Sequence, residues 1–189
     1  MPPKTKITRE QVESAAYEIA RKRGLKAVTA KALAVRLRCS TQPIYWSCGT
    51  MEAIRSAVLA RANEEYRRRL FSPIAGIPAY KAAGLNYIKF AAEEGELYRM
   101  LFLSDRKGDL SILESTLDEN KGVLVAMIRN QTDLTEEKAN ELYAYMWIFS
   151  HGIATMVAAG AAQFSPGTIG KMLTDAYQGF LCRLGGRER

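Results

Sequence analysis

The sequence of 189 residues is poor in the side chains that enzymes most often use for catalysis and metal binding. It has one histidine and three cysteines, and the spacing of Cys39, Cys48 and Cys182 matches no zinc signature. Nucleophile motifs and glycine-rich phosphate loops are also missing. We therefore predict no enzymatic activity, no metal and no cofactor. The odd cysteine count favours reduced thiols in the cytoplasm, and it leaves a redox role of Cys39 and Cys48 open beside a packing role.

Patterns typical of β-strands are missing too, because apolar and polar residues do not alternate between turn signals. Helical periodicity and capping residues instead predict an all-α fold of about nine helices. A proline- and glycine-containing break at residues 71–80 separates a small N-terminal part from a larger body. The expected helices cover residues 8–23, two short stretches within 29–51, then 50–70, 80–93, 95–103, 109–131, a long apolar helix from 135, and 166–184.

Long apolar runs are rare, and residues 142–162 form the exception. This stretch is long enough to cross a membrane, but it contains Ser150, His151 and Gly152 and follows a group of acidic residues. We therefore favour a helix buried in a bundle or at a dimer interface over a membrane span. The polar and basic N-terminal residues predict no secretory signal.

Positive charge is concentrated in the N-terminal part of the chain. Residues 1–70 carry 15 Lys or Arg and 6 Asp or Glu, whereas residues 71–189 carry 12 and 14. A basic N-terminal part on a slightly acidic body indicates a polyanionic partner such as DNA. Membrane phosphates attract the same charge, so charge alone does not choose between these partners.

The segment TAKALAVRLRCSTQPIYWSCGTM, which begins at Thr29, has the pattern of a helix-turn-helix. Thr29 caps the first short helix, and residues 39–40 form the turn. Ser40 or Thr41 caps the second helix, and Pro43 lies in its first turn, where a missing N–H costs little. The expected apolar face of the first helix consists of Ala32, Leu33, Val35 and Leu37, which leaves Lys31, Arg36 and Arg38 to solvent or phosphate.

The N-terminal end of the second helix is where a recognition helix meets base edges. Gln42 offers a donor and an acceptor to adenine, and Thr41 and Pro43 offer apolar contact to a thymine methyl group. Tyr45 can reach a phosphate oxygen. Of two positions open to Trp46, packing beneath the helix is favoured over the phosphate-facing surface. An ordinary helical hairpin of an all-α core is the alternative for the whole segment.

Together these features resemble the TetR (tetracycline-repressor-like) family of transcriptional regulators. A capped first helix ends at glycine, VTAKALAVRLRCS resembles the family's second helix, and STQPIYW resembles its recognition helix. A fourth helix follows at TMEAI. In the body, W-x3-HG (Trp147, His151 and Gly152) resembles a motif of one subgroup. The chain departs from the pattern at Cys48, where a larger apolar residue is usual, and at Met51, where a lysine often contacts phosphate.

The resemblance implies a homodimer that binds palindromic operator DNA through two heads. It implies a DNA-binding domain at residues 1–50, and a domain at residues 51–189 that holds a small effector and dimerises through the last two helices. The expected DNA contacts are Thr29, Lys31, Ser40, Thr41, Gln42, Pro43, Tyr45, Trp46, Ser47 and Thr50. The expected effector contacts are Phe90, Tyr98, Phe102, Met146, Trp147 and His151, although each residue also suits an ordinary core.

The sequence thus predicts a repressor that a largely apolar small molecule releases from its operator. Two other classes stay open. Turnover that survives loss of the basic head would indicate an enzyme. Sedimentation with lipid vesicles, but not with DNA, would indicate a membrane-associated or helical interaction protein.

Overall fold

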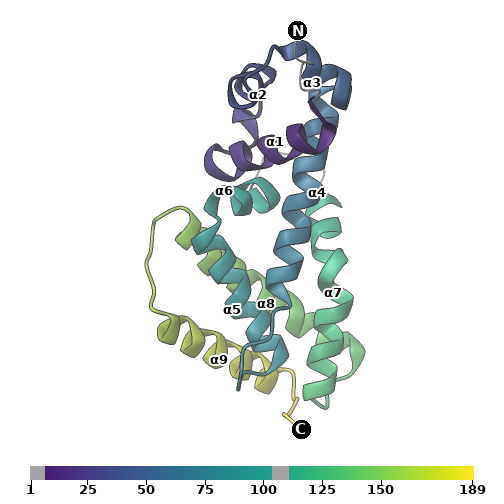
Figure 1. Cartoon of the computed structure of the whole chain (residues 1–189). Helices are drawn as coiled ribbons and strands as arrows, with labels where there is room; N and C mark the ends of the chain where they lie inside the picture. Colours follow the sequence, from purple (N-terminus) through teal and green to yellow (C-terminus); the bar gives the residue numbers. More distant parts are fainter. Residues whose placement is uncertain (1–6, 104–110) are drawn as a thin grey trace. The chain divides into compact units, whose positions relative to one another are not determined.

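Figure 1 shows the computed structural model of the chain, which describes residues 7–103 and 111–189, the side chains of residues 111–119 excepted. These residues form nine α-helices and no strand, which confirms the all-α prediction. A 3-10 turn, η1 (Leu25–Ala27), and a π-helical turn, η2 (Arg99–Leu103), accompany them. The helices are α1 (Arg9–Arg23), α2 (Ala30–Leu37), α3 (Thr41–Cys48), α4 (Met51–Leu70), α5 (Ala79–Glu93), α6 (Gly95–Tyr98), α7 (Ser111–Gln131), α8 (Glu136–Ala158) and α9 (Pro166–Arg183). The predicted helix start at Asp109 lies outside the described residues.

Local capping explains where several helices begin. Thr8 forms a capping box with Gln11 at α1, and Thr135 and Ser165 accept backbone N–H groups at α8 and α9. Ser40 stands at the N-cap of α3, but its side chain makes no capping hydrogen bond. The sequence therefore predicted the position of the N-cap correctly, with Ser40 as one of its two candidates, but the expected capping hydrogen bond with the Ser40 side chain is not formed.

Contacts divide the chain into two compact units. The first comprises Met1–Tyr66 with Glu96–Ser104, and the second comprises Arg67–Gly95 with Asp105–Arg189. Helix α4 thus contributes residues to both units, and the first unit includes a segment that follows α5. The functional boundary placed at residue 50 from the sequence stays a prediction.

The first unit has an apolar core between its four N-terminal helices. The expected stripe of α1, which runs from Val12 to Ala20, is buried. Leu33 of α2, Ile44 of α3 and Ile54 of α4 are each at most 1% exposed. The segment after α5 adds Phe102, whose ring lies 5.1 Å from the rings of both Tyr66 and Tyr98. This core fixes the two short helices that carry the candidate site.

In the second unit, α8 packs against α5, α7 and α9 (Figure 1). Its buried residues include Leu142, Tyr143, Met146 and Ile153. None of the helices in the described part of the chain has the length and apolarity needed to span a bilayer. The preference for a packed helix over a membrane span at residues 142–162 agrees with this finding.

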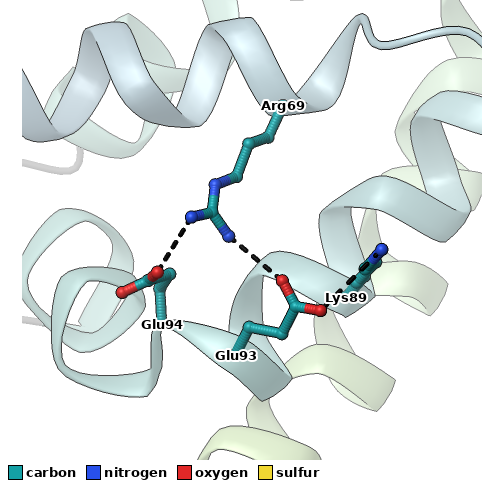
Figure 2. A network of polar contacts seen from close by, with 4 residues as sticks. All are labelled: Arg69, Lys89, Glu93 and Glu94. Carbon is teal, nitrogen blue, oxygen red and sulfur yellow. Dashed lines mark hydrogen bonds and ion pairs between the residues drawn. The ribbon is translucent and has the colours of Figure 1, made fainter.

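Polar contacts fix the last turn of α4 to α5 within the second unit. The Arg69 guanidinium donates to Glu94 Oε1 at 2.9 Å and to Glu93 Oε2 at 3.1 Å, as Figure 2 shows. Asn86 Nδ2 donates to the carbonyl oxygens of Leu70 and Ser72 at 3.2 and 2.8 Å. Two sets of hydrogen bonds, one from Arg69 and one from Asn86, therefore hold the end of α4 to α5.

Candidate functional site

The turn between α2 and α3 leads into the proposed DNA-facing end of α3. Ile44 is fully buried and anchors α3 to the core of the first unit. Thr41 and Gln42 are exposed at the N-terminal end of the helix, and Pro43 is half-buried. Tyr45 is 42% exposed. The residues expected to reach bases are thus accessible, as a recognition helix requires.

Two apolar residues of this region lie on the surface, contrary to the sequence prediction. Trp46 is 75% exposed, so the favoured position beneath the helix is wrong, and Val35 of α2 is 74% exposed. Each lies two residues after the buried anchor of its helix, Ile44 or Leu33, and two residues correspond to about 200° of rotation. The two side chains therefore point away from the core.

Two threonines combine helix capping with a position suited to phosphate. Thr29 Oγ1 accepts the N–H of Ala32 and Thr50 Oγ1 accepts the N–H of Ala53, both at 3.1 Å. A hydroxyl that accepts a backbone hydrogen bond still has its own hydrogen to donate. Both threonines are exposed, as are Lys31 and Ser40.

Ser47 has a contact within the first unit that the sequence did not indicate. Its hydroxyl donates to the carbonyl oxygen of Ile7 at 2.6 Å. A phosphate that accepted this hydrogen would have to compete with Ile7, so the hydroxyl has a clear structural role beside its predicted one.

The expected effector contacts do not all belong to the same unit. Tyr98 and Phe102 are part of the first unit, where their rings contact each other. The second unit contains Phe90 and Met146, which are buried, and Trp147 and His151, which are half-buried. The Arg69 guanidinium lies 5.9 Å from the Phe90 ring centroid.

The tryptophan and histidine of the W-x3-HG motif form a stack on α8. Their ring centroids lie 4.8 Å apart with 13° between the planes. The Tyr87 hydroxyl of α5 lies 2.8 Å from His151 Nδ1. Burial lowers the pKa of His151 from its usual value of 6.5, so the imidazole is neutral at neutral pH. A neutral imidazole has one donor and one acceptor nitrogen, which suits hydrogen bonding to an uncharged partner.

Tyr87 is the member of this cluster that the sequence analysis missed. It lies 64 residues before His151, and nothing in its local pattern distinguishes it from the other buried residues of α5. Such pairing depends on how α5 packs against α8, which the sequence of neither helix encodes locally.

A family model described as "Tetracyclin repressor-like, C-terminal domain" matches residues 80–177, slightly more than half of the chain. The chain belongs to the TetR family. The match spans α5 to most of α9 and includes the tryptophan–histidine stack. The family match thus extends to the body, where the sequence had indicated it through length, helical content, an apolar penultimate helix and the short W-x3-HG motif.

Solved structures with the TetR-like fold cover nearly the whole chain. A TetR-like transcriptional regulator from Rhodococcus sp. RHA1 has a TM-score of 0.69 at 16% identity, with 92% of this chain and 96% of that chain covered. A transcriptional regulator from the same organism has a TM-score of 0.63 at 18% identity, with 94% and 97% covered. No curated protein matches the chain. Membership of the TetR family supports a DNA-binding transcriptional regulator, and regulators of this family are generally not enzymes.

Proposed function

We propose that this protein is a homodimeric repressor that a small molecule, bound in the second unit, releases from operator DNA. The observation that carries the DNA-binding part is the exposed N-terminal end of α3, with Thr41 and Gln42 accessible and Ile44 fixing the helix. The strongly basic composition of residues 1–70 supports the same partner. We place its action in the cytoplasm, where such a regulator meets its operator.

In this proposal Thr41, Gln42 and Pro43 contact base edges, and the surrounding polar residues position the head on phosphates. The exposure of Trp46 adds a large ring to the surface beside Tyr45. The residues proposed to contact the backbone of the DNA are Thr29, Lys31, Ser40, Tyr45, Trp46, Ser47 and Thr50.

The proposed dimer interface involves α8 and α9. Ile148, Gly152 and Met156 lie four residues apart on one face of α8, and all three are exposed. Ile148 is 63% and Met156 46% exposed, and exposed apolar residues that share one helix face are a candidate protein interface. Gly152 would let a partner helix approach closely. A second copy of the chain is the occupant that the family membership favours.

The proposed effector contacts in the second unit centre on the Trp147–His151 stack and on Tyr87. Helix α5 carries Tyr87 directly beside Asn86, and Asn86 holds the end of α4. An effector that displaces α5 would therefore act on α4, whose earlier residues belong to the unit with the helix-turn-helix. Such a shift between DNA-competent and DNA-incompetent populations is how we propose that release occurs.

Operator binding is tested with the full-length protein and a library of random DNA duplexes. We expect selection of a pseudo-palindromic sequence, with half-sites separated by about one helical turn or a multiple of it. Fluorescence anisotropy on the selected duplex should show a steep loss of affinity with salt. Gln42→Ala should relax specificity at one base position of each half-site and cost about 1–3 kcal/mol there.

Gln163→Ala is the matched control, because Gln163 is an exposed glutamine of the second unit. It should leave affinity and specificity unchanged. Equal, weak binding to all duplexes would contradict the regulator proposal. Association with anionic lipid vesicles under the same conditions would then favour a membrane surface as the polyanion.

Effector binding is followed through the fluorescence of Trp147 in a Trp46→Phe variant, which leaves Trp147 as the remaining tryptophan of the chain. Compounds from a metabolite library that quench this signal should also lower the operator affinity of the unmodified protein. Compounds that quench Trp147 without any change in operator affinity would argue against release by ligand.

A further inference from the structure

One residue between the two helices of the helix-turn-helix has an unfavourable backbone conformation. Arg38 ends α2 in the left-handed region, with φ 52° and ψ 46°. Every other residue with positive φ in the described part of the chain is a glycine. Non-glycine residues avoid this region because the Cβ atom comes too close to the following carbonyl oxygen.

The conformation is fixed by the way α2 terminates. The N–H of Arg38 donates to the Val35 carbonyl at 3.3 Å, and the N–H of Cys39 donates to the Ala34 carbonyl at 3.0 Å. Glycine is the usual residue at such a helix end and would adopt it without strain. Arginine here therefore costs stability that glycine would not.

Among the described residues, Arg38 has no polar partner that would offset this cost. The residue is exposed, and its guanidinium has no hydrogen bond or ion pair within the described ranges 7–103 and 120–189. Lys31 and Arg36 are also exposed cations of α2, but both lie in ordinary helical backbone. Within the part of the chain that the structure describes, Arg38 alone combines a charge without a polar partner with a left-handed backbone position.

We propose that Arg38 is a further DNA contact, whose guanidinium binds a backbone phosphate beside the recognition helix. The arginine at this position lowers the folding stability of the protein in exchange for this contact. This inference rests on the proposed function. Arg38 lies three residues before Thr41, where α3 begins and where the proposed base contacts start. Phosphates flank the groove that a recognition helix occupies, and a guanidinium can bind a phosphate with two parallel hydrogen bonds.

The substitution Arg38→Gly should have opposite effects on folding and on DNA binding. Relief of the backbone strain should raise the Tm by about 2–4 °C for a chain of this size. Each lost phosphate contact reduces the slope of log K against log salt by about 0.9, which corresponds to about fivefold in affinity at 0.15 M salt. For a dimer with two heads, we expect about 30-fold weaker binding and a slope smaller by about 1.8.

Two further variants separate the effect of the Arg38 charge on DNA binding from the effect of its backbone strain on stability. Arg38→Lys keeps the charge and the strain, so the salt slope should stay close to that of the unmodified protein and the Tm should not rise. Arg38→Asn removes the charge with a residue that tolerates the left-handed region, and its salt slope should match that of Arg38→Gly. All measurements use the full-length protein and the duplex that it selects from the random library.

Arg38→Gly binding with unchanged affinity and salt slope would overturn this inference while the proposed function stands. An unmodified protein that selects no duplex would overturn the proposed function and this inference together. Weaker binding by Arg38→Gly without a rise in Tm would contradict the proposed cost to folding.

Discussion

Removal of the Glu94 carboxylate should destabilise the second unit much more than removal of its neighbour Glu93. Both accept hydrogen bonds from Arg69, at 2.9 and 3.1 Å (Figure 2). They differ in environment, because the Glu94 side chain is 5% exposed and the Glu93 side chain is 50% exposed. Glu93 also has Lys89 at 3.8 Å as a second partner. The two residues thus form a matched pair that differs in burial.

The expected size of the effect follows from that difference. Breaking a fully buried ion pair costs about 3–5 kcal/mol, because it leaves a charge buried without its partner. The Arg69 side chain is 25% exposed and retains Glu93, so we expect about 2–3 kcal/mol for Glu94→Ala. Glu93→Ala removes an exposed partner and should cost about 0–1 kcal/mol. For Glu94→Ala this corresponds to a fall in Tm of about 5–10 °C.

Thermal and urea unfolding followed by circular dichroism, at one fixed protein concentration, measure both losses. Glu94→Gln keeps an acceptor without the charge and should lie between Glu94→Ala and the unmodified protein. The double change Arg69→Met with Glu94→Leu should recover much of the loss, since neither charge of this pair is then left without the other. Equal losses for Glu94→Ala and Glu93→Ala would refute the argument from burial.

Three other predictions follow from exposure and from the single histidine. Trp46→Ala should change the free energy of unfolding by less than about 0.5 kcal/mol, because the side chain is 75% exposed, yet it should weaken operator binding in the anisotropy assay. As the pH falls below the unfolded pKa of 6.5, the unfolded chain takes up the His151 proton more readily than the folded chain, so stability should decrease. Urea titrations between about pH 7.5 and pH 5.5 should show this decrease, and His151→Gln should flatten it, because the chain has no other histidine. Ile148→Glu on α8 should convert the proposed dimer to a monomer in light scattering after gel filtration. Val123→Glu on α7 should not, although Val123 is 47% exposed, and a monomer in both cases would argue against α8 as the interface.

Features set by a few neighbouring residues were predictable from the sequence. Thr8, Thr135 and Ser165 mark the starts of α1, α8 and α9 through hydrogen bonds to residues three positions on. The buried stripe of α1 follows from helical periodicity in the same local way. The match of residues 80–177 to a TetR C-terminal domain also agrees with a family assignment that rested mainly on the helix-turn-helix.

Features that depend on tertiary context were missed. Trp46 and Val35 are apolar, and burial was the reasonable expectation, but each eight-residue helix exposes the face opposite its one anchor. The left-handed backbone of Arg38 contradicts local preference, so no propensity argument indicates it. Departures from local rules tend to occur where a surface serves binding, and these three residues lie in the proposed DNA-binding region.

The first unit is discontinuous in sequence, and this limits how its DNA specificity can be exchanged between proteins. A chimera that took only residues 1–66 would separate Tyr66 from Phe102, whose ring it contacts across the gap in sequence. A functional transplant would have to carry residues 96–104 as well, inserted behind a foreign α5. Residues 67–95, which belong to the second unit, lie between these two segments in the sequence. Recombination between TetR regulators that keeps both segments together would therefore pass on DNA preference and the start of the second unit as one inherited block.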